Sequence, residues 1–92
     1  MRAGYPAGPD PHIAFVREDV TPRTPGVCEA CLRTRSRWVH LRLCLTCGQV
    51  GCCDSSPNRH ARRHAALVGH PIVRSAEPGE HWRWCYVDES FA

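Results

Sequence analysis

The sequence contains no lysine and no long run of apolar residues. All twelve basic residues are arginine. The beginning of the chain, MRAGYPAGPDPHIAFVRED, lacks the apolar core of a signal peptide, and no later stretch is long and apolar enough to span a membrane. We therefore expect a cytoplasmic protein that does not act at a membrane.

Motifs of several common enzyme classes are also missing. A zinc deaminase needs His-x-Glu, yet neither His12 nor His40 is followed by Glu at the second position. The chain has no Gly-rich phosphate loop and no recognisable Ser/His/Asp set. We predict that the protein is not an enzyme and has no catalytic residues.

The length and composition predict one small domain that needs disulfides or bound metal for stability. Proline and glycine are concentrated in MRAGYPAGPDP and TPRTPG, so we expect residues 1–25 to form a Pro/Gly-rich tail or weakly ordered segment and residues 26–92 to form the folded domain. A domain of this size buries only about 60% of its unfolded surface. Seven Cys, an odd number, and six His in a reducing compartment favour zinc over disulfides.

Short strands and one main helix are expected after residue 28. WVHLRL alternates, with Val39, Leu41 and Leu43 on one face, and QVGC, PIVRS and HWRWCYV are further strands. Ser56 and the proline after it predict the start of a helix that runs to about residue 68, where Gly69 ends it. The predicted fold class is a small, zinc-stabilised α+β domain, with a mostly antiparallel sheet packed with one main helix.

Eight residues have the spacing of zinc ligands. Two Cys-x2-Cys pairs can each grip an ion from a tight turn, and one cysteine and three histidines follow them within a short stretch. His60 and His64 are four apart, on one face of the expected helix, so they could share an ion or complete two different ions. The eight candidate ligands, enough for two Zn²⁺ ions, are Cys28, Cys31, Cys44, Cys47, Cys52, His60, His64 and His70.

The motifs CEAC, CLTCGQVGC, HARRHAALVGHPIV and WRWCYV together resemble the UBP-type zinc finger, the ubiquitin-binding finger of ubiquitin-specific proteases. The resemblance covers residues 28–87 and implies that Cys52, and not its neighbour Cys53, is a ligand. It also implies that two ligand sets interleave. Zinc 1 would be held by Cys28, Cys31, Cys52 and His60, and zinc 2 by Cys44, Cys47, His64 and His70.

A third zinc site is not expected. Some members of the family bind a third ion through a cysteine at the position of Cys85, a second cysteine three residues later and an upstream Cys/His pair. Asp88 stands where that second cysteine would be, and no Cys-x-His precedes Cys28. We expect Cys85 to be a small buried thiol.

Alternation in the last strand places Trp82, Trp84 and Tyr86 on one face. Such a row is usually part of the core, but the resemblance implies that Trp84 and Tyr86 line the pocket that takes the C-terminal tail of ubiquitin. Two positions depart from the family: Asp54 replaces the arginine that holds the tail carboxylate, and Arg42 replaces a tryptophan. An acid in place of that base reverses the local charge and argues against a ubiquitin tail.

Three interpretations of this pocket remain open. Arg42 could restore the positive charge and keep carboxylate recognition. Asp54 with Trp84 and Tyr86 could form an acidic aromatic cage for a cation. Alternatively, Asp54 only caps the turn before the helix, and the pocket has no ligand.

The sequence therefore predicts a non-catalytic zinc module that recognises a protein or peptide. The alternative is an arginine-rich zinc protein that binds nucleic acid. The formal charge of +3 is small, and two Zn²⁺ ions would add four positive charges while five ligand thiolates removed five, leaving +2. The arginines that favour the alternative form two groups, namely Arg33, Arg35 and Arg37, and Arg59, Arg62 and Arg63.

Overall fold

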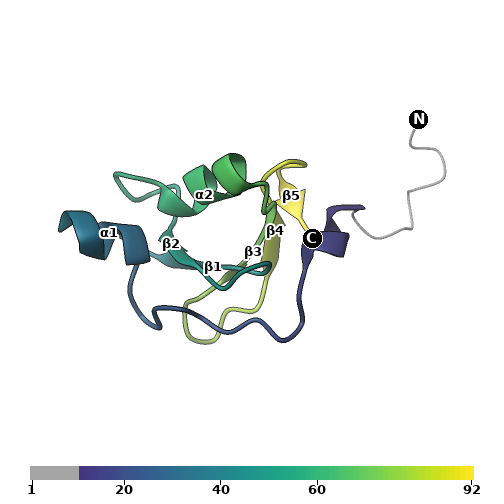
Figure 1. Ribbon diagram of the computed structural model, residues 1–92, viewed down its shortest axis with the longest axis horizontal. Helices are drawn as coiled ribbons and strands as arrows, with labels where there is room; N and C mark the ends of the chain where they lie inside the picture. The colour runs from purple at the N-terminus through teal and green to yellow at the C-terminus, as the bar shows by residue number, and fades with distance from the viewer. Residues whose placement is uncertain (1–10) are drawn as a thin grey trace.

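The computed structural model describes residues 11–92, which form a five-stranded antiparallel sheet with helices packed around it (Figure 1). The strand order is β2-β1-β3-β4-β5. This architecture confirms the predicted small α+β domain. The strands are β1 (Leu41–Cys44), β2 (Val50–Cys52), β3 (Ile72–Ser75), β4 (Arg83–Cys85) and β5 (Ser90–Phe91), and the helices are η1 (Pro11–Phe15), α1 (Glu29–Thr34) and α2 (His60–Val68).

The strand expected over WVHLRL begins three residues later than predicted. Leu41 and Leu43 are buried as expected, whereas Val39 is 52% exposed and lies before β1. The Val39 N–H donates to Ser56 Oγ at 2.9 Å, and so this backbone group is bound by a loop side chain instead of a neighbouring strand. Tertiary contact with the loop therefore overrides the local alternation.

The main helix, α2, also begins later than predicted. It starts at His60 after Arg59, which has left-handed backbone angles and makes no side-chain cap. Ser56, the expected N-cap, is instead buried and accepts the hydrogen bond from Val39. The predicted C-terminal end is confirmed, because Gly69 takes φ 74° and its N–H donates to Ala65 O at 3.1 Å.

Helix α1 and strand β5 were not predicted. The turn of the first Cys-x2-Cys pair continues into α1, with Cys28 as its N-cap: the Cys28 Sγ accepts from the Cys31 N–H at 3.4 Å. Cysteine is not among the usual N-cap residues, so capping preferences did not predict that a helix begins here. Strand β5 has only two residues, Ser90 and Phe91, which pair with β4.

The hydrophobic core is small and contains many of the candidate metal ligands. Its fully buried aliphatic side chains include Leu43, Val50 and Ile72. Cys28, Cys31, Cys52 and Cys85 belong to the same cluster of buried residues. Much of what an ordinary domain would fill with aliphatic side chains is therefore filled here with thiols.

Residues 11–27 lie along the domain on the side of the sheet away from α2 (Figure 1). The Arg17 N–H donates to Leu45 O and the Arg23 N–H to Gly48 O, both at 2.8 Å. Val16 and Val20 pack against the core. The part of the predicted tail before residue 11 lies outside the described residues. No helix in the described part of the chain is long and apolar enough to cross a membrane.

Candidate metal centres and aromatic pocket

Four side chains from three elements converge at the first metal cluster. Cys28 and Cys31 come from α1 and its cap, Cys52 from the end of β2, and His60 from the first residue of α2. All four ligand atoms lie within 4.8 Å of one another. The three cysteines are fully buried, so the protein shields them from solvent.

The distances in this cluster fit a tetrahedral zinc ion. With Zn–S near 2.3 Å and Zn–N near 2.0 Å, a tetrahedron has edges of about 3.8 Å between sulfurs and about 3.6 Å between sulfur and nitrogen. His60 Nδ1 lies 3.4 Å from Cys28 Sγ, 3.3 Å from Cys31 Sγ and 3.5 Å from Cys52 Sγ. The two sulfurs of Cys31 and Cys52 are 3.8 Å apart. The donor set and its dimensions suit Zn²⁺.

The second cluster joins the β1–β2 hairpin to α2 and the loop after it. Cys44 ends β1 and Cys47 lies in the hairpin turn, while His64 comes from α2. Cys47 Sγ lies 3.3 Å from His64 Nε2, and His70 Nδ1 lies 3.5 Å from Cys44 Sγ and 3.2 Å from His64 Nε2. These are again the edges of a tetrahedron of zinc ligands.

The two sets of four are therefore brought together as the resemblance implied, and their role as ligands stays a prediction. The spacing of His60 and His64 left open whether they share an ion. In the structure each lies in a different cluster. Four residues of α2 separate the two side chains by about 6 Å along the helix axis, which is enough to reach two different ions.

A close approach between β2 and α2 holds these clusters in place. A side chain at Gly51 would put its Cβ 2.7 Å from the Ala61 backbone nitrogen and 2.8 Å from the Ala61 Cα. Only glycine leaves room for this contact. The contact sets Cys52, the next residue, beside His60, whose backbone N–H donates to Cys52 Sγ at 3.2 Å.

Burial shifts the pKa values of several candidate ligands toward their uncharged forms. It raises the pKa of Cys31 to about 12, with hydrogen bonds and charge repulsion from Cys28 and Cys52 adding to the effect. Burial also raises the pKa of Cys44, partly offset by backbone hydrogen bonds. The pKa of His60 is lowered by burial and by the nearby Arg63 and Arg33. Metal binding therefore has to displace protons from the thiols.

Cys53 lies outside both clusters, although it is a direct neighbour of Cys52. Its Sγ is buried and 3.6 Å from Ser56 Oγ. Burial alone would raise its pKa, but hydrogen bonds with Ser56 and with the backbone at His40 leave the pKa below its usual value. Alternation along the end of β2 separates the two thiols, so only Cys52 points toward His60.

A third group of possible ligands was not expected from the sequence. His12 Nδ1 lies 3.1 Å from Asp88 Oδ2 and 3.5 Å from Cys85 Sγ, and the Cys85 Sγ is 3.7 Å from Asp88 Oδ2. The three ligand atoms lie within 4.8 Å of one another. Cys85 is buried as predicted, but its neighbours His12 and Asp88 are side chains of types that can ligate a metal. His12 precedes Cys85 by 73 residues, so no short spacing in the sequence indicated this group.

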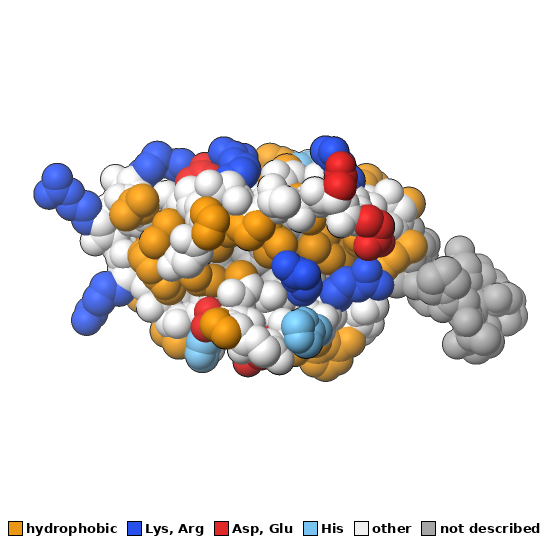
Figure 2. Space-filling model, turned by 90° about the horizontal axis from the view of Figure 1, so that it is seen from below, with side chains coloured by type: hydrophobic (Ala, Val, Ile, Leu, Met, Phe, Trp, Pro, Cys, Tyr) orange, Lys and Arg blue, Asp and Glu red, His pale blue; other side chains and the backbone are white. Residues whose placement is uncertain are grey.

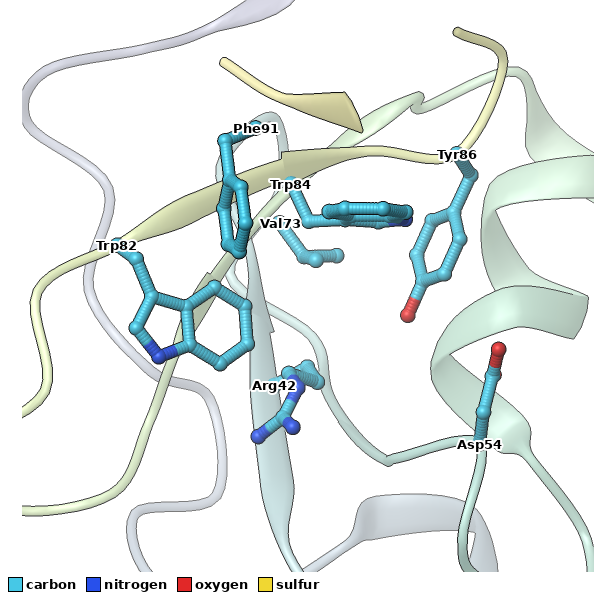
Figure 3. A pocket seen from close by; sticks show the side chains of 7 residues that line it. All are labelled: Arg42, Asp54, Val73, Trp82, Trp84, Tyr86 and Phe91. Carbon is cyan, nitrogen blue, oxygen red and sulfur yellow. The ribbon is translucent and has the colours of Figure 1, made fainter. Parts of the chain in front are cut away.

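An aromatic pocket of about 370 Å³ lies on the sheet, where most of its lining residues come from β3, β4, β5 and the residues beside them (Figure 3). Val73 on β3 forms its base, and Trp84 and Tyr86 line it as the sequence indicated. Trp82 and Phe91 complete the wall; the Phe91 ring meets Trp84 edge-on at 5.2 Å and Trp82 at 5.9 Å between centroids. Phe91 was missed because β5 is too short to be predicted.

Two charged side chains stand on opposite sides of this pocket. The Arg42 guanidinium lies over the Trp82 ring, 4.5 Å from its centroid, while Asp54 lies near Tyr86 (Figure 3). Asp54 Oδ2 accepts two hydrogen bonds from Arg62, at 2.9 Å from Nε and 2.6 Å from Nη2. Arg62 also lies 5.3 Å from the centroid of the Tyr86 ring. The predicted pocket residues Arg42, Asp54, Trp84 and Tyr86 are thus all brought together.

Two of the six arginines that favour nucleic-acid binding have acidic partners. Arg62 is paired with Asp54, and Arg33 Nη1 lies 3.4 Å from Glu29 Oε2. On the face shown in Figure 2, arginine side chains stand among hydrophobic and acidic ones and form no continuous basic patch.

Comparisons with known proteins agree with this geometry. A family model described as Zn-finger in ubiquitin-hydrolases and other protein matches residues 28–92. The solution NMR structure of protein RPA1320 from Rhodopseudomonas palustris is 54% identical, with a TM-score of 0.79, and the match covers 90% of this chain and 79% of that one. No curated protein matches the sequence.

Proposed function

The chain belongs to the family of zinc fingers found in ubiquitin hydrolases and other proteins, and from this we propose that it is a non-catalytic module that recognises a protein or peptide. The observation that carries the proposal is the aromatic pocket of Trp82, Trp84, Tyr86 and Phe91. Exposed aromatic walls with a few charged groups are typical of peptide-binding sites. The second metal cluster includes Cys44 of β1, the strand that also carries Arg42 of the pocket.

A structural role for zinc follows from the number of donors in the two main clusters. Each offers four protein ligands, which fill a tetrahedral ion and leave no position for a substrate or a water nucleophile. We propose that these two sites serve folding and do not catalyse a reaction. The seven free cysteines suit a reducing compartment, which supports a cytoplasmic location.

Two zinc ions per chain is the proposed content. Elemental analysis of protein purified without added metal should give two equivalents of zinc. Three equivalents would contradict this count and assign the third ion to the cluster of His12, Cys85 and Asp88. The variant Asp88→Asn, which removes a donor outside the two main clusters, should leave the content at two.

Peptide recognition can be tested by NMR. The ¹⁵N-labelled, zinc-loaded protein is titrated with a pool of short peptides that differ in terminal and side-chain charge, and with ubiquitin as one defined probe. We expect the indole N–H resonances of Trp82 and Trp84 to shift with at least one peptide. The matched variants are Trp84→Ala, which should abolish the shifts, and Leu67→Ala, an exposed residue outside the pocket, which should not.

Nucleic-acid binding is the competing function and makes a different prediction. It requires arginines free to meet phosphates, yet Arg62 and Arg33 already face acidic side chains. A gel shift with generic DNA or RNA that weakens steeply with salt would favour this alternative over peptide recognition. We expect no such shift at physiological ionic strength.

A further inference from the structure

A small polar cavity of about 110 Å³ lies between the N-terminal segment and the sheet, on the face opposite the aromatic pocket (Figure 1). Arg74 of β3 and Arg83 of β4 line it from the sheet, and Arg17 lines it from the segment. Val73 lines the aromatic pocket, so its strand neighbour Arg74 points to the other face. Arginines from three separate segments therefore line one cavity.

Arg74 and Arg83 are direct cross-strand partners in the pairing of β3 with β4. Side chains at such positions have Cβ atoms about 5 Å apart on one face of the sheet, and like charges there destabilise the pairing. Neither arginine has an ion-pair partner within residues 11–92. The strand pairing thus holds two positive charges side by side without an acidic contact in this part of the chain.

The Arg74 guanidinium also contains an unsatisfied hydrogen-bond donor. Its Nε is shielded from solvent and has no hydrogen-bond partner, and among residues 11–92 no other buried side-chain nitrogen or oxygen is in this condition. Such a donor is costly, and buried polar groups in native proteins normally have a protein, water or ion partner. The Arg74 side chain lines the cavity, so an anion oxygen held there can supply the missing acceptor.

The size and the donors of the cavity favour a small tetrahedral oxyanion. Its volume is roughly that of four water molecules in the liquid, well below the pockets of about 300 Å³ or more that take larger ligands. A guanidinium presents its N–H donors in a planar fork that matches phosphate oxygens. Phosphate and sulfate each offer four oxygens to the three arginines, whereas a carboxylate offers two.

Two acidic side chains near these arginines limit the positive charge of the cavity. Glu18 lines it, but no ion pair joins Glu18 to an arginine within residues 11–92. Asp19 Oδ2 lies 3.6 Å from Arg17 Nη2, and this pair is weak because the two side chains are 64% and 78% exposed. Three arginines and one lining carboxylate leave an excess of positive charge, which an oxyanion complements.

We propose that this cavity is an oxyanion site, in which Arg17, Arg74 and Arg83 bind a phosphate-type group between the N-terminal segment and the sheet. The anion separates the like charges of Arg74 and Arg83 and gives the Arg74 Nε–H an acceptor. Because Arg17 belongs to the segment, the anion also helps to hold this segment on the sheet. The site is independent of peptide recognition in the aromatic pocket, which lies on the other face.

The test is a titration of the zinc-loaded ¹⁵N-labelled protein with sodium sulfate and, separately, with sodium phosphate, both at constant ionic strength. We expect saturable shifts of the arginine Nε–H resonances of Arg17, Arg74 and Arg83, and a melting temperature that rises with anion concentration. Sodium acetate and sodium chloride are the controls and should bind at least tenfold more weakly. Equal shifts with chloride would show only general screening and would overturn the proposal.

Substitutions of the arginines test which side chains bind the anion. Arg83→Gln should weaken sulfate binding by about tenfold or more, because charge-assisted hydrogen bonds are lost. Without the anion it should melt no lower than the parent, since the like-charge contact with Arg74 is gone. Arg74→Lys keeps the charge but removes the Nε–H and the planar fork, and it should weaken binding to a similar extent.

The matched control is Arg63→Gln, which makes the same charge change on α2, outside the cavity. It should change the sulfate affinity by less than about twofold. Circular dichroism and zinc content confirm that each variant is folded. Unchanged sulfate affinity in Arg83→Gln, or an equal loss in Arg63→Gln, would overturn the assignment of the site.

Glu18→Gln decides whether Glu18 itself serves as the anion of this cavity. If the arginines bind an external oxyanion, removal of the lining carboxylate should strengthen sulfate binding severalfold. If neither sulfate nor phosphate binds to the parent, the proposal is wrong, and a lower melting temperature of Glu18→Gln then identifies Glu18 as the partner of the arginines.

Phenyl phosphate distinguishes the two sources of a phosphate group. Binding as tight as that of inorganic phosphate supports a site for a phosphate ester, and binding of the inorganic ions alone supports a site for the free anion. Both results support the oxyanion site and leave the proposed recognition function to its own peptide titration.

Discussion

Arg62 on α2 and Asp54 after β2 form an ion pair whose closest atoms, Nη2 and Oδ2, are 2.6 Å apart. The pair joins the helix that carries His60 and His64 to the rim of the aromatic pocket. Hydrogen bonding to Asp54, more than its charge, raises the pKa of Arg62. The pair thus connects the helix that carries these two candidate ligands to the site of proposed recognition.

The Arg62–Asp54 pair should contribute little to stability, despite its short distances. Both side chains are about 40% exposed, at 40% and 44%, and exposed ion pairs typically contribute less than about 1 kcal/mol. A double-mutant cycle with Arg62→Gln and Asp54→Asn, measured by urea unfolding, should therefore give a coupling energy below about 1 kcal/mol. A coupling of 3 kcal/mol would show that the pair is a major structural element.

Removal of zinc should unfold the domain. Structural zinc contributes on the order of 10 kcal/mol in small fingers, which is comparable to the whole stability of a domain of this size. The five cysteines and three histidines of the two clusters would otherwise form a polar, poorly filled centre. We expect a chelator to abolish the circular dichroism spectrum of the native state and excess zinc to restore it. A near-native spectrum after complete zinc removal would contradict the structural role.

Cys52 and Cys53 provide a matched pair of substitutions. Cys52→Ser removes a ligand that lies 3.5 Å from His60 Nδ1, so the variant should lose one zinc equivalent and should not fold stably. Cys53→Ser replaces a buried thiol that lies outside the clusters and should cost about 1 kcal/mol with zinc content unchanged. Zinc analysis and thermal melts of both variants check this. Loss of zinc in Cys53→Ser alone would reverse the assignment.

Gly51→Ala should strain the junction of β2 and α2. The added methyl group would meet backbone atoms of Ala61 at 2.7 and 2.8 Å, and the helix cannot retreat without moving His60 away from Cys52. We expect a loss of about 2 to 3 kcal/mol. The control Gly79→Ala has open space around it and only the strain of φ 80°, so its cost should be about 1 kcal/mol. Equal costs would show that the junction adjusts freely.

Acid should release zinc and destabilise the fold. Burial lowers the pKa of His60, as do Arg63 and Arg33, and burial and His70 lower that of His64. The unfolded chain, with histidine pKa values near 6.5, therefore takes up protons before the folded chain does. The contribution of these histidines to stability is complete above pH 6.5 and is lost as the pH falls below it. A zinc-sensitive dye and circular dichroism between pH 8 and 4.5 should report release and unfolding together; full zinc retention at pH 4.5 would contradict this.

The aromatic side chains of the last strand show what strand alternation alone can predict. Side chains of Trp82, Trp84 and Tyr86 fall on one face because successive strand residues point in opposite directions, and the pocket confirms this. The same rule placed Val39 on the inner face, where it does not lie. Alternation orders side chains within a strand but does not say where pairing begins, which the Ser56 side chain decides here.

The sequence by itself determined the zinc-finger family, the small α+β class and the eight residues that form the two main clusters, because ligand spacing and turn geometry are local properties of the chain. Only the tertiary structure decided what depends on contacts between distant segments: that Arg62 neutralises Asp54, and that His12 lies beside Cys85 and Asp88. The physical reason is that a charge acts over the few ångströms to its neighbours in space, and no spacing in the sequence reports which side chains those neighbours are.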